Sequence, residues 1–385
     1  MKITDITIRQ LQGIREADGA PYEARSAKPV DIYDEFRDDG PERSPGIQKA
    51  GTKVKHLFVE VHTDSDVSGV YGPILMSQVW PIEHQLGPFL VGRDPLPTER
   101  LWNLMVKAFR HSHAGYMLMA ISALDCALWD LRGKHEGQPV YRLIGDAQRG
   151  RVPAYGSMLG HSLQPDMVHE RASAFFARGF TSQKWFFRHG PGSGEEGKDR
   201  NEQLAATLRE ALGNEAELMF DAYMSWNVEY AVEMANRLAP YKPKWLEEAL
   251  PPYDLDGWKQ LKAGTDVPLA AGEHLYGCWD VKPFLDAGIL DYVQTDPDWC
   301  GGITELVRIC KLAGKYGAKV VPHGHDLLSA LHVAASQPEE TCPMVEHLFQ
   351  HLANQHFFLQ DVPAPEDGWI TVPDRPGLGI VFNKK

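Results

Sequence analysis

The stretch KWLEEALPP, residues 244–252, ends an apolar run in two adjacent carboxylates, Glu247 and Glu248, and then in two prolines. The apolar run predicts a buried strand, and the prolines predict that the strand stops there. The same order of a short apolar strand, a polar residue and a helix recurs along the chain from about residue 150. This recurrence decides the predicted fold.

Strand-like stretches alternate with helix-like stretches of ten to fifteen residues in this part of the chain. Strands are predicted at residues 180–187, 216–222, 243–250, 267–274, 290–296, 318–324 and 343–349, with one more near residues 151–158. Such alternation is typical of parallel βαβ units, and eight units close an α/β protein into a (β/α) barrel. A doubly wound open sheet is the alternative, but no predicted strand leads into a G-x-G-x-x-G turn.

The N-terminal part predicts an α+β capping domain. The expected elements are a strand at residues 2–12, a hairpin at 54–73 with its turn at 62–69, and helices at 92–111 and 114–133. Residues 15–50 are rich in Gly, Pro and charge, which predicts either disorder or a functional lid. We expect a capping and lid domain at residues 1–135, a modified barrel at 136–360, and a C-terminal segment at 361–385 that returns to the capping domain.

The composition narrows the classes of function. The chain of 385 residues has 43% hydrophobic and 24% charged residues, which is typical of a globular protein, and its net charge of −13 argues against nucleic acid or an anionic membrane as partner. Its five cysteines fit neither a disulfide framework nor a zinc site. Charges occur throughout the first twenty residues and interrupt the most apolar stretch, so we expect no signal peptide, no membrane span and a cytoplasmic location.

Seven of the eight predicted barrel strands end in a polar or charged residue. In chain order these residues are Lys184, Asp221, Glu247, Glu273, Asp296, His323 and Glu346. A packed barrel needs apolar residues inside its strands and needs no charge at seven successive strand ends. The carboxyl ends of the strands build the active site in this fold, so we expect these residues to surround one site.

Three of these residues, Asp221, Glu247 and Glu273, are spaced by 26 residues each time, so neighbouring strands carry them. Two unit charges about 4 Å apart repel by about 4 kcal/mol at an effective dielectric constant near 20, so three converging carboxylates require a cation or shared protons. Ligands that are all oxygen favour a hard divalent ion, and Mg²⁺ is the expected one. The alternative is that each carboxylate caps a helix or pairs with Lys or Arg.

Only one carboxylate of the pair 247–248 is expected to face this metal, because adjacent strand residues face opposite sides. We expect it to be Glu247, since Asp221 and Glu273 also directly follow the apolar run of their strands. Glu248 is then expected to orient a ligand or to pair with a neighbouring cation.

The next two strand ends predict a general base. Asp296 and His323 lie on consecutive predicted strands, and a carboxylate beside a histidine fixes the tautomer of the ring and raises its basicity. The alternatives are a structural histidine in a loop, or His325 as the base. Lys184 is expected to contact an anionic oxygen or a metal-bound carboxylate, and Phe186, on the same face, stands where a second base could have been.

Five motifs in order resemble the enolase superfamily, in its mandelate racemase subgroup. They are MFDAYMSW, WLEEALPP, AAGEH, VQTDPDWCGG and VVPHGH. With SALDCALWDLRGKHEGQPVYRLIG before them and PGLGIVFN after them, the resemblance covers essentially the whole chain. The stretches WCGG, EEALPP and KWFFRHGP favour the rhamnonate dehydratase branch of that subgroup.

The resemblance implies a set of roles. Asp221, Glu247 and Glu273 would bind Mg²⁺, which holds the carboxylate of an acid sugar and stabilises the charge formed when a base removes the α-proton. His323 and Asp296 match the His–Asp dyad of the family, and Glu346 matches the carboxylate that hydrogen-bonds the substrate acid. The lid matches the segment that sets substrate choice, and family members assemble as homo-oligomers. The further expected substrate contacts are Arg43, Tyr223 and His325.

One departure from the racemases decides the expected reaction. Racemases of the subgroup carry a second Lys at the position of Phe186, and a racemase needs a base on each face of the α-carbon. We therefore expect a Mg²⁺-dependent dehydratase, a carbon–oxygen lyase, that acts on an aldonate such as L-rhamnonate and gives a 2-keto-3-deoxy acid. His323 would return a proton to the departing 3-hydroxyl, and His274 is a second possible acid or else a hydrogen-bond donor to a ligand. The alternatives are an epimerase or racemase, a metal-dependent aldolase, and a metal-binding barrel without activity.

Overall fold

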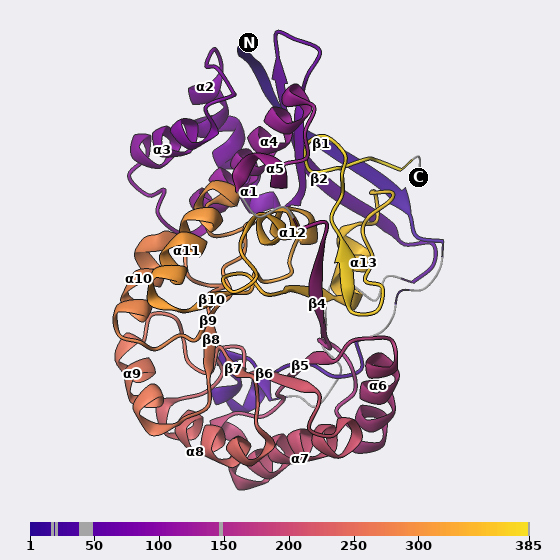
Figure 1. The fold of residues 1–385 in the computed structure, drawn as a ribbon, viewed down its shortest axis with the longest axis vertical. Helices are drawn as coiled ribbons and strands as arrows, with labels where there is room; N and C mark the ends of the chain where they lie inside the picture. The colour runs from indigo at the N-terminus through magenta and orange to yellow at the C-terminus, as the bar shows by residue number, and fades with distance from the viewer. Residues whose placement is uncertain (17–18, 20–21, 38–48, 146–148, 384–385) are drawn as a thin grey trace.

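The computed structural model describes residues 1–16, 19, 22–37, 49–145 and 149–383. Figure 1 shows an antiparallel sheet with helices at one end of the molecule and a ring of strands and helices at the other. The last described part of the chain lies beside the N-terminal sheet (Figure 1). Within the described ranges, no helix has the length and apolar character needed to cross a membrane.

The N-terminal sheet has the order β1-β2-β3 and is antiparallel throughout. Its strands are β1 (Ile3–Ile14), β2 (Lys53–Thr63) and β3 (Gly69–Ile74), so the predicted first strand and hairpin are confirmed. Helix α4 (Gly115–Glu136) packs on the sheet and is buried along most of its length, which explains its apolar composition. The predicted helix at 92–111 begins only at Thr98, as α3 (Thr98–Ala108), because residues 91–97 form an irregular turn. The short helical turns α1 (Met76–Pro81), η3 (Ile82–Leu86) and α2 (Gly87–Leu90) were not predicted.

All eight predicted barrel strands are present. They are β4 (Arg151–Ser157), β5 (Ser182–Phe186), β6 (Glu217–Asp221), β7 (Trp245–Glu247), β8 (Leu269–Ala271), β9 (Tyr292–Val293), β10 (Lys319–Val320) and β11 (Val345–Leu348). Their spatial order is β10-β9-β8-β7-β6-β5-β4-β11, with every one of these pairs parallel. The amide of Val320 donates to the carbonyl of Thr341, just before β11, at 2.7 Å, so the two ends of the sheet meet. A doubly wound sheet would place later strands on both sides of the first, so this order confirms the barrel.

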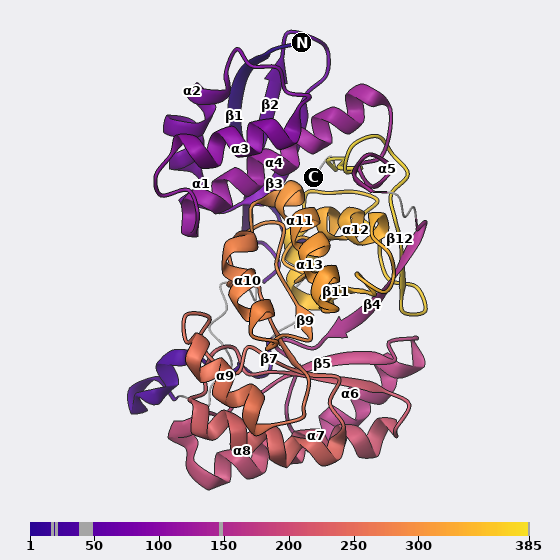
Figure 2. The same ribbon diagram turned by 60° about the vertical axis from the view of Figure 1, so that its left-hand side comes forward.

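The helices between the strands form the outer ring seen in Figures 1 and 2. They are α6 (Pro165–Ala177), α7 (Gly194–Leu212), α8 (Val228–Leu238), α9 (Leu255–Gly264), α10 (Gly277–Asp286), α11 (Gly302–Tyr316) and α12 (Leu327–Ser336). After β11 come the short helix α13 (Phe349–Gln355) and the strand β12 (Trp369–Thr371), and β12 pairs antiparallel with β4. The ring of Phe382 then packs edge-on against Phe58 of β2, with centroids 4.9 Å apart. The domain boundaries given above remain predictions.

An apolar cluster fills the interior of the barrel. It contains Tyr155, Met219, Trp245, Ala270, Val321 and Met344. Because side chains alternate along a strand, the residue two positions further on points the same way. Asp221, Glu247, His323 and Glu346 each follow a member of this cluster by two residues, so they lie directly above this apolar layer.

Candidate active site

A cavity of about 150 Å³ opens at the carboxyl ends of the barrel strands. Its lining includes five of the predicted site residues, Lys184, Asp221, Tyr223, Glu273 and His323. A larger cavity of about 670 Å³ lies against residues 23–25 and helices α6 and α7, but none of the predicted metal ligands lines it. The smaller cavity is therefore the candidate active site.

Lys184 lies at the floor of this site, buried among three carboxylates. Its Nζ is 2.5 Å from Oε1 of Glu247, 3.0 Å from Oε1 of Glu346 and 3.3 Å from Oδ2 of Asp221. Burial opposes the charged ammonium, but Glu247 and Glu346 outweigh it and raise the pKa of Lys184. An ammonium held in this way stays protonated and serves as a fixed positive charge.

Glu247 and Glu248 are both buried but have different partners. Glu247 accepts hydrogen bonds from Lys184, from Nε1 of Trp245 at 2.9 Å and from Nε2 of Gln294 at 2.6 Å. Glu248 follows the end of β7 and has a φ of 42°, so the alternation of a strand does not apply to it. The expectation that the two residues face opposite sides depended on that alternation. Sequence periodicity carries no signal for this backbone turn.

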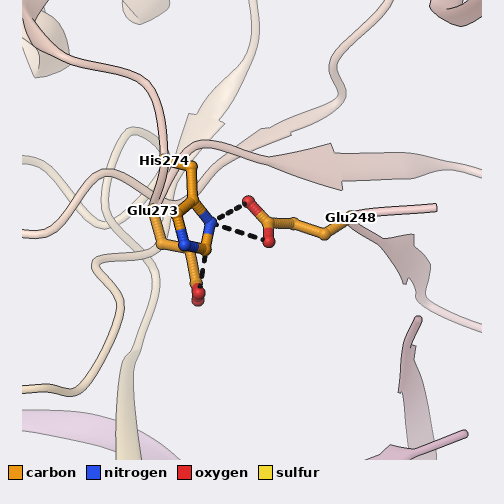
Figure 3. A group of neighbouring side chains, drawn as sticks. All are labelled: Glu248, Glu273 and His274. Carbon is orange, nitrogen blue, oxygen red and sulfur yellow. Dashed lines mark hydrogen bonds and ion pairs between the residues drawn. The ribbon is translucent and has the colours of Figure 1, made fainter. Parts of the chain in front are cut away.

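The carboxylate of Glu248 faces His274 (Figure 3). Nδ1 of His274 lies 3.0 and 2.9 Å from its two oxygens and 3.4 Å from Oε1 of Glu273. These three side chains each offer one ligand atom within 4.8 Å of the others, so the geometry adds Glu248 to the carboxylates that could hold a cation. Burial favours the neutral ring of His274, but the bond to Glu248 outweighs it and raises the pKa of His274 to about 9.

The carboxylates repel one another. Burial raises the pKa of Asp221 to about 6, with Lys184 opposing the shift and Glu273 and Glu248 adding to it. Burial likewise raises the pKa of Glu273 to about 7, again with Glu248 adding to the shift. Buried carboxyls that resist ionisation beside one another, with oxygen atoms as the available donors, fit a hard divalent cation. The chemistry of this donor set therefore agrees with the expected Mg²⁺.

His323 and Asp296 form the expected dyad. Nδ1 of His323 lies 2.8 Å from Oδ2 of Asp296, and its Nε2 lies 3.2 Å from Oε2 of Glu273. Burial favours the neutral ring, but Glu273 and Asp296 outweigh it and raise the pKa of His323. Because Glu273 contributes most to this rise, a cation that offsets its charge would bring the ring toward the neutral form that a base needs.

The remaining predicted site residues are Glu346, Tyr223, His325 and Arg43. Oε2 of Glu346, which is fully buried, accepts the backbone amide of Gly324 at 3.0 Å. Tyr223 lines the cavity, and its amide donates to Oδ1 of Asp221 at 2.9 Å. His325 does not line the cavity, and its ring lies beside Trp299 with centroids 5.0 Å apart. Arg43 lies outside the described residues.

The described part of the lid crosses the mouth of the barrel. It contains the turns η1 (Pro29–Ile32) and η2 (Asp34–Phe36), whose purple ribbon Figure 2 shows beside the lower part of the barrel, far from the N-terminal sheet. The amide of Ala27 donates to the carbonyl of Phe187 at 2.7 Å, and Ser26 and Lys28 line the cavity. Sequence reasoning missed both lining residues, since a polar segment without periodicity gives no signal for which side chains turn inward.

An ion pair fastens this lid to the barrel. The carboxylate of Glu23 accepts a hydrogen bond from each terminal nitrogen of Arg171 on α6, one of them at 2.6 Å. It also accepts a hydrogen bond from the amide of Ser162 at 2.9 Å. The bond to Arg171 lowers the pKa of Glu23. The pair therefore stays charged at neutral pH.

Sequence comparison places the chain in a family. The family described as "Enolase C-terminal domain-like" matches residues 167–385, and the family described as "Mandelate racemase / muconate lactonizing enzyme, N-terminal domain" matches residues 38–145. The first match alone covers more than half of the chain, so the protein belongs to the enolase superfamily. The family and the enolase-type fold expected from the five motifs are confirmed.

Individual relatives are more specific. The chain is 34% identical over 368 residues to an L-rhamnonate dehydratase of Saccharopolyspora erythraea, which covers 93% of this chain and 89% of that protein. It resembles the crystal structure of rhamnonate dehydratase from Gibberella zeae complexed with Mg, with a TM-score of 0.82, 29% identity, and coverage of 100% of this chain and 95% of that one. It also resembles a racemase from Streptomyces coelicolor A3(2) with bound magnesium, with a TM-score of 0.79, 25% identity, and coverage of 99% and 97%. The expected Mg²⁺ agrees with both solved relatives.

Proposed function

We propose that this protein is a Mg²⁺-dependent dehydratase of an acid sugar, a hydro-lyase that gives a 2-keto-3-deoxy acid. The observation that carries the proposal is the pairing of the His323–Asp296 dyad with Phe186 in one cavity. Fold alone does not separate this reaction from racemisation, because one solved relative is a racemase. The side chain on β5 does separate them, since racemisation needs a second base there and Phe186 carries no proton to exchange.

The metal would be held by Asp221, Glu247 and Glu273, three buried carboxylates on neighbouring strands. When bound, Mg²⁺ would supply a positive charge that anchors the substrate carboxylate and stabilises the charge that develops beside it. Lys184 adds a second fixed cation close to the same carboxylates. Glu248 would hold His274 in place beside the metal.

His323 would remove the proton on the carbon next to the substrate carboxylate, through Nε2. Asp296 would accept a hydrogen bond from the protonated Nδ1 of His323, so that Nε2 has the free lone pair that a base requires. The C–O bond at the neighbouring carbon then breaks, and the hydroxyl leaves as water with a proton from the protonated His323. The resulting enol tautomerises to the 2-keto-3-deoxy acid. His274, whose pKa is raised to about 9, would be charged at neutral pH and is the second possible donor of that proton.

The substrate would be an aldonate such as L-rhamnonate, the acid named for two of the relatives. The cavity supports a substrate that carries both polar and apolar groups, because Leu159, Phe186 and Leu348 line it together with the charged residues. Tyr223 and the lid residue Lys28 would contact the hydroxyls between them. Assembly as a homo-oligomer and a cytoplasmic location remain predictions.

The deciding experiment incubates the protein and Mg²⁺ with a set of mono- and diacid sugars in D₂O. The expected result is a 2-keto acid from an aldonate, with no deuterium-labelled epimer in the recovered substrate. Recovery of an epimer carrying deuterium, without keto acid, would instead identify an epimerase or racemase. C–C cleavage products would identify an aldolase, and a lack of any turnover would favour a metal-binding barrel without activity. His323→Asn, assayed in parallel, shows that any product comes from this site.

A further inference from the structure

A second His–Asp pair lies directly outside the first. His325 and Asp298 follow His323 and Asp296 by two residues, so each pair is repeated one step further along the same two segments. Nδ1 of His325 lies 2.5 Å from Oδ2 of Asp298. His325 was expected to contact substrate, but it does not line the cavity, and the proposed chemistry uses only the inner pair.

The outer pair supports the inner one through its backbone. The amide of Asp298 donates to Oδ1 of Asp296 at 2.7 Å, and the amide of His325 donates to Oδ2 at 3.1 Å. With Nδ1 of His323, three donors therefore hold the two oxygens of Asp296, which is fully buried. The position of the Asp296 carboxylate depends on where these two amides lie.

The capping domain reaches this network through Tyr71 of β3. Its hydroxyl donates to Oδ1 of Asp298, and it also lies 3.0 Å from Oγ of Ser329 on α12. Tyr71 is only 2% exposed and Asp298 only 6%, so water cannot replace the bond between them without opening the interface of the two domains. The carboxylate of Asp298 is thus held on one side by the capping domain and on the other by His325.

Trp299 fills the space between the two histidines. Its ring centroid lies 5.1 Å from that of His323 and 5.0 Å from that of His325. A shift of the outer pair would therefore displace the inner ring by packing as well as by hydrogen bonds.

We propose that Tyr71 and Asp298 are positioning residues for the base: their bonds fix the backbone at residues 298 and 325, whose amides set Asp296 and, through it, His323. The inference rests on the proposed role of His323 as base. In this proposal the capping domain shapes the catalytic site through Tyr71 as well as through its lid.

The test compares Tyr71→Phe with Ser329→Ala. Tyr71→Phe removes only the hydroxyl, whereas Ser329→Ala removes the other partner of that hydroxyl and leaves the bond to Asp298 in place. We expect Tyr71→Phe to slow α-proton exchange in D₂O and formation of keto acid by the same factor, roughly 10–100-fold, as for supporting residues at other sites. We expect KM and the Mg²⁺ affinity to change by less than about twofold, and Ser329→Ala to behave as the wild-type protein.

Three results would overturn the proposal. One is α-proton exchange at the wild-type rate in Tyr71→Phe, and another is an equal loss of exchange in Ser329→Ala. The third is loss of elimination in Tyr71→Phe with exchange retained, which would make the outer pair a proton donor. If Tyr71→Phe fails to fold, His325→Gln breaks the bond to Asp298 from the other side and should give the same loss. The imidazole N–H signal of His323 in ¹⁵N-histidine-labelled protein separates this idea from the proposed function. It should change in Tyr71→Phe even if the wild-type protein exchanges no proton of any acid sugar; an unchanged signal refutes the positioning role.

Discussion

Nδ1 of His323 lies 2.8 Å from Oδ2 of Asp296, although 27 residues separate them in the chain. The opposite nitrogen of the ring faces Glu273 at 3.2 Å. One imidazole therefore connects a buried supporting carboxylate to the cluster of carboxylates proposed to hold the metal.

The first prediction concerns this ring. His323→Asn should lose α-proton exchange and keto acid formation by on the order of 10²–10⁴-fold, because it removes the base. Binding of Mg²⁺, measured by calorimetry, should stay near the wild-type value, since the carboxylates are untouched. Exchange at the wild-type rate in this variant would show that another group takes the proton.

Asp221→Asn tests the metal site. The amide lacks the charge that attracts a divalent ion, so the affinity for Mg²⁺ should fall by more than about tenfold and turnover should disappear. Circular dichroism and the melting temperature of the metal-free protein should remain close to wild type, because burial already favours the neutral form of the Asp221 carboxyl and the amide is neutral too. Retained Mg²⁺ affinity would exclude Asp221 as a ligand.

The two neighbouring glutamates can be separated by matched substitutions. Glu247→Gln should abolish tight Mg²⁺ binding if Glu247 is the ligand, whereas Glu248→Gln should weaken it by roughly 10–100-fold, as expected for a group that supports the site. Calorimetric titration of both variants with Mg²⁺ decides between them. The reverse order of losses would make Glu248 the ligand, in agreement with its closeness to Glu273 and His274.

The metal-free protein should lose stability as the pH rises through neutrality. Burial raises the pKa of Asp221 to about 6 and the pKa of Glu273 to about 7. Burial opposes the charged form of His274, but the bond to Glu248 outweighs it and raises the pKa of His274 to about 9. Between about pH 4 and 9 the folded state therefore binds more protons at these groups than the unfolded state does. Stability contributed by such protons is complete at low pH and is lost as the pH rises. Denaturant unfolding at a series of pH values should show this decline, and saturating Mg²⁺ should oppose it most at high pH. A rise in metal-free stability from pH 6 to 9 would contradict the prediction.

The ion pair between Glu23 and Arg171 should matter for substrate binding. Glu23→Gln keeps the shape of the side chain but removes the charge, which should weaken the attachment of the lid by about 1 kcal/mol and raise KM several-fold. The affinity for Mg²⁺ should not change, because the pair does not touch the carboxylate cluster. Steady-state kinetics measure kcat and KM separately. A fall in kcat without a change in KM would show that the lid acts on the chemistry.

Much of the fold followed from local patterns. Strands such as 216–222 and 243–250 were recognisable because an apolar run ends in a charged or polar residue, and seven of the eight barrel strands were found in this way. The expectation that Glu247 and Glu248 face opposite sides rested on strand alternation, and that alternation does not extend to Glu248, where the backbone takes a φ of 42°. The start of α3 at Thr98 and the lining residues Ser26 and Lys28 depend on contacts with distant segments, and local periodicity carries no record of those contacts.

The sequence by itself determined the barrel, the succession of charged strand ends and the family, because period, spacing and motif order are properties of neighbouring residues. Only the tertiary structure decided which carboxylates meet. Lys184 is surrounded by Asp221, Glu247 and Glu346, and Tyr71 reaches Asp298 across 227 residues of chain. Such contacts form because closing the barrel and docking the cap bury charges that must find partners, and the identity of each partner is set by geometry in three dimensions.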